Sequence, residues 1–61
     1  MDPNETLRLL AIAILEENKS EACEHYENLK NWLARGGFEP AWTHMSRRQF
    51  FSFNPRTGRI E

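Results

Sequence analysis

Apolar residues recur with helical spacing in the first third of the chain. Four of them lie at i, i+3, i+4 and i+7, which is one face of a helix: Leu7, Leu10, Ala11 and Ile14. Asp2 favours a helix start, because its carboxylate can accept hydrogen bonds from the free N–H groups of a first turn. Pro3 suits the first helical position, and Glu5 stands where a capping box places an acid. The pattern therefore predicts a helix over 3–17.

A second apolar stripe runs along the same predicted helix. Leu9, Ile12 and Ala13 fall on the other side from the first stripe. A helix that is apolar nearly all round is normally buried on more than one side. One partner helix covers one stripe, so the second stripe needs either the C-terminal segment or another copy of the chain. We interpret Leu9, Ile12 and Ala13 as a surface for self-association.

The next polar break and apolar stripe predict a second helix over 20–35. Its main stripe has helical spacing, with His25 and Trp32 on one flank: Ala22, Tyr26, Leu29 and Leu33. Asn18 or Ser20 can cap its start, and Asn18 is followed three residues later by Glu21. A connection this short makes the two helices antiparallel, as a helical hairpin.

Two glycines end this helix, and large aromatic residues surround them. Gly36 is expected to take the left-handed conformation, with Phe38 folding back on the last helical turn. Trp32, Phe38 and Trp42 lie within eleven residues and are interpreted as a small core under this stop. The alternative is that one tryptophan is exposed and anchors a partner, because Trp is enriched at interface hot spots. Trp42 is the candidate for that role.

Residues 38–61 are expected to form an aromatic arm folded back on the helices. The segment 49–53 is the best strand candidate, and strand alternation would place Phe51 and Phe53 on the same side. Asn54-Pro55-Arg56-Thr57-Gly58 has the composition of a turn, so a β-hairpin over 49–60 is possible. The predicted fold class is α, or small α+β: an antiparallel two-helix hairpin followed by an aromatic arm or short C-terminal β-hairpin, in one domain over 1–61.

Charge is divided unevenly along the chain. Residues 1–37 hold four basic and seven acidic side chains, whereas residues 38–61 hold four basic and two acidic ones. The basic-aromatic arm offers a nucleic-acid surface through five residues: Arg47, Arg48, Phe50, Arg56 and Arg59. The isoelectric point is near 6.1, whereas nucleic-acid-binding domains usually have values above about 9. Nucleic-acid binding is therefore the second interpretation.

Residues with catalytic or metal-binding chemistry are few and scattered. Cys23 is the only cysteine, so no disulfide forms within the chain, and the lone thiol favours a reducing cytoplasm. Cys23 and His25 would point about 200° apart on a helix and cannot converge on one atom. His44 stands alone. We predict no catalytic, cofactor or metal residues and no small-molecule substrate. The longest apolar run, residues 9–15, is too short to span a membrane, and we expect no secretion signal.

The start of the chain and the end of the second predicted helix carry a resemblance. Asp2-Pro3-Asn4 and the segment Trp32-Leu33-x-Arg35-Gly36-Gly37-Phe38-x-Pro40 resemble short uncharacterised helical-hairpin proteins of bacteria and phages. The resemblance implies shape and origin, and it carries over no activity. Residues 50–58 also resemble the central hairpin of WW domains, but the Trp-x-x-Pro that closes the WW ligand groove does not follow. The sequence as a whole predicts a small non-catalytic protein-interaction module that forms a homo-oligomer.

Overall fold

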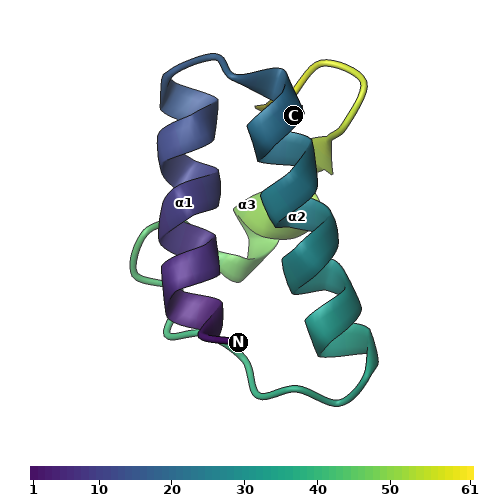
Figure 1. The fold of residues 1–61 in the computed structure, drawn as a ribbon. Coiled ribbons are helices and arrows are strands. Elements are labelled where there is room, and N and C mark those ends of the chain that lie inside the picture. The colour runs from purple at the N-terminus through teal and green to yellow at the C-terminus, as the bar shows by residue number, and fades with distance from the viewer.

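The computed structural model describes residues 1–61 and shows two antiparallel helices with the C-terminal third folded against them (Figure 1). The elements in order are α1 (Pro3–Leu15), α2 (Lys19–Ala34), α3 (Arg47–Phe51), β1 (Phe53–Asn54) and β2 (Arg59–Ile60). In Figure 1, α3 lies behind the α1–α2 hairpin, and the C-terminal β-hairpin lies near the start of α2. The predicted fold class, a helical hairpin followed by a small β-hairpin, is confirmed. No helix combines the length and the apolar character needed to cross a bilayer.

Both long helices begin and end at local signals in the sequence. The Asp2 carboxylate accepts from the N–H groups of Asn4 and Glu5 at 3.0 and 3.4 Å. Asn18 caps α2 by accepting from the N–H of Glu21 at 3.2 Å. A left-handed residue lies two positions after the end of each helix, Glu17 after α1 (φ 57°) and Gly36 after α2 (φ 86°). Because Glu17 reverses the chain, α1 is two residues shorter than predicted.

The core lies between the two helices and the segment that folds back on them. Nine buried residues form it, three from α1, three from α2 and three from the C-terminal third: Leu7, Leu10, Ala13, Ala22, Tyr26, Leu29, Met45, Phe50 and Phe53. The ring of Tyr26 lies at the centre, 5.0 Å from the ring of Phe50 and 4.7 Å from that of Phe53. The C-terminal third is therefore part of the hydrophobic core.

The prediction of a strand over 49–53 is wrong, because residues 47–51 form α3. Ser46 and Gln49 make a capping box: the Ser46 hydroxyl accepts from the Gln49 N–H at 3.1 Å, and the Gln49 side chain accepts from the Ser46 N–H at 2.9 Å. Helical geometry reverses the predicted orientation of the phenylalanines. Phe50 is fully buried, while Phe51 is 51% exposed.

The β-hairpin is shorter than the predicted range and its turn is as expected. Phe53 pairs with Ile60, and Asn54 pairs with Arg59. The Asn54 carbonyl accepts from the N–H of Gly58 at 2.8 Å, and Gly58 has a φ of 71°. The turn chemistry was therefore predicted correctly, and only the first strand was extended too far.

Candidate interaction surfaces

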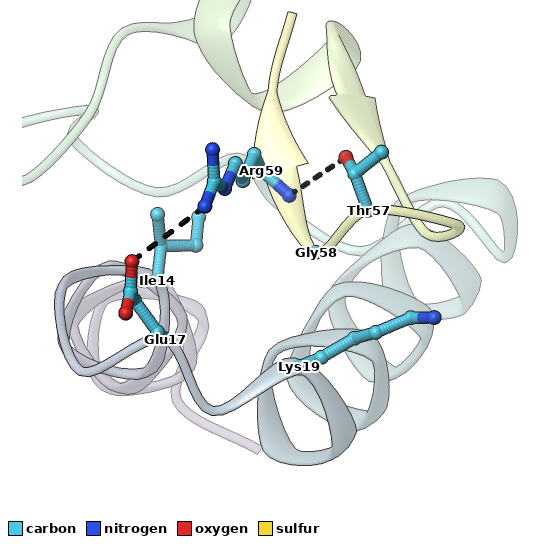
Figure 2. A pocket seen from close by; sticks show the side chains of 6 residues that line it. All are labelled: Ile14, Glu17, Lys19, Thr57, Gly58 and Arg59. Atoms are coloured by element: carbon cyan, nitrogen blue, oxygen red, sulfur yellow. Dashed lines mark hydrogen bonds and ion pairs between the residues drawn. The ribbon is translucent and has the colours of Figure 1, made fainter.

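The β-hairpin meets the connection between α1 and α2 at a small hollow of about 170 Å³. Six residues line it: Ile14, Glu17, Lys19, Thr57, Gly58 and Arg59. Figure 2 shows Gly58 facing Lys19, and Arg59 reaching Glu17 at 3.6 Å. A Cβ atom at Gly58 would lie 2.9 Å from Cγ of Lys19, so the turn sits directly on the start of α2. The close approach makes this hollow a packing seam, which holds the hairpin in place.

The end of α1 presents apolar side chains to solvent. Leu15 is 82% exposed and Ile12 is 37% exposed. Beside Leu15 lies a hollow of about 190 Å³ with mostly apolar walls: Ala11, Ile14, Leu15, His44, Met45, Gln49 and Ile60. Single exposed apolar residues are common, but Leu15 also lines this apolar hollow, so its side chain is not isolated on the surface.

The residues of α1 that were predicted for the protein interface differ in their exposure to solvent. Leu9 is half-buried and Ile12 is exposed, as an interface on α1 requires. Ala13 is only 4% exposed, so its assignment to a self-association surface is wrong. It lies within the α1–α2 core because the two helices pack along a broader face than the first stripe alone. Leu15 was missed, although it lies three residues after Ile12 and thus on the same helical face.

Trp42 is held against the core. Its indole N–H donates to Oε1 of Glu39 at 2.9 Å, and its ring centroid lies 5.6 Å from that of Phe50. Its backbone has a φ of 55°, an uncommon conformation for a bulky residue. The indole is half-buried, and its N–H already has a hydrogen-bond partner within the chain.

A second surface, which we call the α2–α3 groove, lies between the C-terminal half of α2, the segment that follows it, and α3. Its volume is about 400 Å³, and its lining mixes apolar and charged residues: Lys30, Leu33, Ala34, Gly37, Glu39, Arg47 and Phe51. The Arg47 guanidinium stands 4.9 Å from the centre of the Phe51 ring and pairs with Glu39 at 3.4 Å. Lys30 also lines the groove, and its ammonium lies 5.8 Å from the centre of the Tyr26 ring. The lining thus combines apolar side chains with two cations, Lys30 and Arg47.

The residues predicted for nucleic-acid binding come from two elements. Arg47 and Arg48 lie on α3, whereas Arg56 and Arg59 lie on the β-hairpin. Arg47 and Arg59 are each paired with a carboxylate. Phe50 was predicted to stack on bases, but it is fully buried and has no exposed face to offer, so that assignment is wrong. Burial follows from the helical form of α3, which turns Phe50 toward Tyr26.

The only cysteine, Cys23, makes a contact that joins two parts of the fold. The Cys23 thiol donates to the Pro55 carbonyl oxygen at 3.3 Å, which ties α2 to the hairpin turn. No three side chains of His, Cys, Asp or Glu lie close enough together to hold a metal ion.

No protein-family model matches the chain, and no curated protein or solved structure matches it either. The surfaces themselves therefore carry the functional argument.

Proposed function

We propose that this chain is a small, non-catalytic interaction module that binds a second copy of itself through the exposed end of α1. The observation that carries the proposal is Leu15, which stands 82% exposed beside Ile12 on the same helical face. Fully burying a leucine side chain is worth about 1.5–3 kcal/mol. Burial of Leu15 together with part of Ile12 would supply a substantial part of the free energy of a weak homotypic association.

The small size of the domain also supports self-association. Its buried apolar core contains nine residues, and a chain of this length buries a smaller fraction of its surface than a larger domain does. Binding of a second copy to the folded state stabilises that state by mass action. We further propose a cytoplasmic location, which agrees with the free thiol of Cys23.

Light scattering over a dilution series tests the proposal. The wild-type chain is expected to exceed its monomer mass of 7.2 kDa at high concentration and to return to it on dilution. Leu15→Glu should give the monomer mass at every concentration, because a carboxylate would have to be buried at the contact. Asn28→Glu is the matched control, since it adds the same charge at an exposed position of α2. A wild-type chain that stays at 7.2 kDa throughout contradicts the proposal.

Nucleic-acid binding by α3 is the alternative, and one observation favours it. Arg48 is exposed and makes no ion pair, and the exposed ring of Phe51 lies on the same short helix. If this surface binds single strands, the affinity should fall steeply with added salt, because neutralised phosphates release counterions. Fluorescence anisotropy of a labelled oligonucleotide at low salt tests this alternative. An unchanged anisotropy at the highest protein concentration excludes it.

A further inference from the structure

We propose that the end of α1 of one copy docks head to tail into the α2–α3 groove of a second copy. The inference rests on self-association through Leu15 and adds the surface that receives it. Leu15, Glu16 and Glu17 form what we call the α1 tip. Two different surfaces of the chain, the α1 tip and the α2–α3 groove, would then meet in every contact.

The shape of the α1 tip suits a groove. Leu15 is the last residue of α1, and the left-handed Glu17 turns the chain away immediately afterwards. The leucine therefore stands at the end of the hairpin, where the connection between α1 and α2 is seen in Figure 1. The α2–α3 groove holds about 400 Å³, against about 190 Å³ for the hollow beside Leu15 itself. Leu33 and the half-exposed Phe51 supply apolar contact for a leucine.

The α1 tip could meet either the α1 tip or the α2–α3 groove of a second copy, and these two surfaces differ in charge. Glu16 and Glu17 follow Leu15 directly, and only Glu17 has an ion-pair partner, Arg59, in an exposed pair. Lys19 adds one more cation at this end, beside the acidic Glu21. If two α1 tips met about a two-fold axis, the Glu16 carboxylates of both copies would lie close to each other. Like charges at an interface repel and weaken binding.

The α2–α3 groove offers the opposite charge. Lys30 and Arg47 are the two cations in its lining, and Glu39 is the one acidic residue there. Glu39 already pairs with Arg47 at 3.4 Å, which leaves the Lys30 ammonium without a carboxylate partner. A docked tip would bring Glu16 to this cation while Leu15 enters the groove. Complementary charge of this kind fixes orientation and excludes the reversed arrangement.

The positions of the two surfaces determine the kind of assembly. The α1 tip lies at the start of α2, and the groove lies at its end, a helix of 16 residues away, which is about 24 Å. One copy can therefore use both surfaces at once, with one neighbour at each. Contacts between two different surfaces produce rings when the rotation closes and open chains when it does not.

Two blocking variants and their mixture test the head-to-tail contact. Leu15→Glu removes the apolar side chain of the α1 tip and leaves the α2–α3 groove unchanged. Ala34→Glu places a carboxylate in the groove and leaves the α1 tip unchanged. Ala34 is exposed, so its substitution leaves the core intact. Each variant alone should show the monomer mass of 7.2 kDa in light scattering. An equimolar mixture should form a one-to-one complex of twice that mass, because one intact tip then meets one intact groove.

Charge reversal supplies a second test that does not depend on a blocked groove. Glu16→Lys and Lys30→Glu should each weaken association by about tenfold if the pair is worth about 1.4 kcal/mol. A chain that carries both changes should associate again, since the charges are exchanged between tip and groove. Circular dichroism establishes that every variant is folded.

The outcomes separate the two proposals. If the wild-type chain associates but Ala34→Glu associates equally well, the groove is not the receiving site, while self-association stands. If both blocking variants are folded monomers and their mixture stays monomeric, the contact pairs identical surfaces and the inference is overturned. If the wild-type chain is monomeric at every concentration, both the proposed function and the inference fail.

Discussion

The indole N–H of Trp32 donates to the carbonyl oxygen of Phe38 at 2.9 Å, and the two rings meet edge to face with their centroids 5.5 Å apart. Between them, Gly36 takes a φ of 86°, and the N–H of Gly37 donates to the carbonyl oxygen of Trp32 at 2.9 Å. The indole therefore lies across Gly37 and closes the end of α2. The Trp32–Phe38 contact fixes the direction in which the chain leaves toward Trp42 and α3.

The two glycines of this stop should respond differently to substitution. At Gly36 a Cβ atom meets nothing within 4 Å, so Gly36→Ala is penalised only by its left-handed backbone, about 1–2 kcal/mol. At Gly37 a Cβ atom would overlap the indole ring of Trp32. Gly37→Ala should lower stability by up to about 3 kcal/mol, as overpacking does. Urea denaturation measures both changes.

Only Gly37→Ala should also displace the indole. The Trp32 N–H resonance in an NMR spectrum is expected to move in that variant and to stay in place in Gly36→Ala. Equal shifts in the two variants would show that the indole does not lie over Gly37.

The neighbouring phenylalanines Phe50 and Phe51 provide a test of α3. Phe50 is fully buried against Tyr26, so Phe50→Ala should lower the free energy of unfolding by about 3–5 kcal/mol. Because such a loss can unfold a small domain, Phe50→Leu serves as a milder variant with the same direction. Phe51 is half exposed, and Phe51→Ala should change stability by about 1 kcal/mol or less. A larger loss at Phe51 than at Phe50 would favour the strand over α3, because strand alternation would bury Phe51 and expose Phe50.

Local signals made the helical hairpin predictable from the sequence. Asp2 and Asn18 cap the helices through side chains two or three residues from the N–H groups that they satisfy. Gly36 ends α2 because its missing Cβ permits the left-handed conformation. Each of these features depends on a few adjacent residues, so each can be read without knowing the tertiary structure.

One error concerns a local signal: Phe51 and Phe53 suggest strand alternation, whereas the Ser-x-x-Gln spacing of Ser46 and Gln49 is that of a capping box and indicates a helix start. The other errors arose where distant residues decide the outcome. Ala13 was placed on a free face because the angle at which α2 crosses α1 is set by side-chain packing along both helices. The α2–α3 groove joins segments separated by an irregular path, and the left-handed Trp42 within that path has no local sequence signal.

The seating of the β-hairpin on α2 gives another prediction, at Gly58. Its φ of 71° already disfavours alanine, and a Cβ atom there would lie 2.9 to 3.1 Å from side-chain and backbone atoms of Lys19. Gly58→Ala should therefore destabilise the fold more than Gly36→Ala, which shares the positive φ but meets no neighbour. Thermal unfolding compares the two variants. A smaller loss at Gly58 would mean that the turn does not rest on the start of α2.

Glu5 should contribute to the pH dependence of the free energy of unfolding. Hydrogen bonds from the Arg8 guanidinium, one of them 3.2 Å from Nε to Oε2, hold the pKa of Glu5 below its usual 4.5, and the charges of Arg8 and His44 act in the same direction. A carboxyl whose pKa is lowered on folding stabilises the native state above its unfolded pKa. That contribution is lost as the pH falls through the lowered folded value.

NMR titration of the Glu5 carboxyl carbon tests directly whether Arg8 lowers the pKa of Glu5. In the wild-type chain the midpoint should lie below 4.5, and in Arg8→Ala it should rise toward that value, because the hydrogen bonds are removed. The accompanying change in stability should be small, since both side chains are exposed and surface pairs are well screened. The stability difference between wild type and Arg8→Ala should therefore narrow between pH 4.5 and more acidic solution. A Glu5 midpoint that does not move in Arg8→Ala would show that the pair does not form in solution.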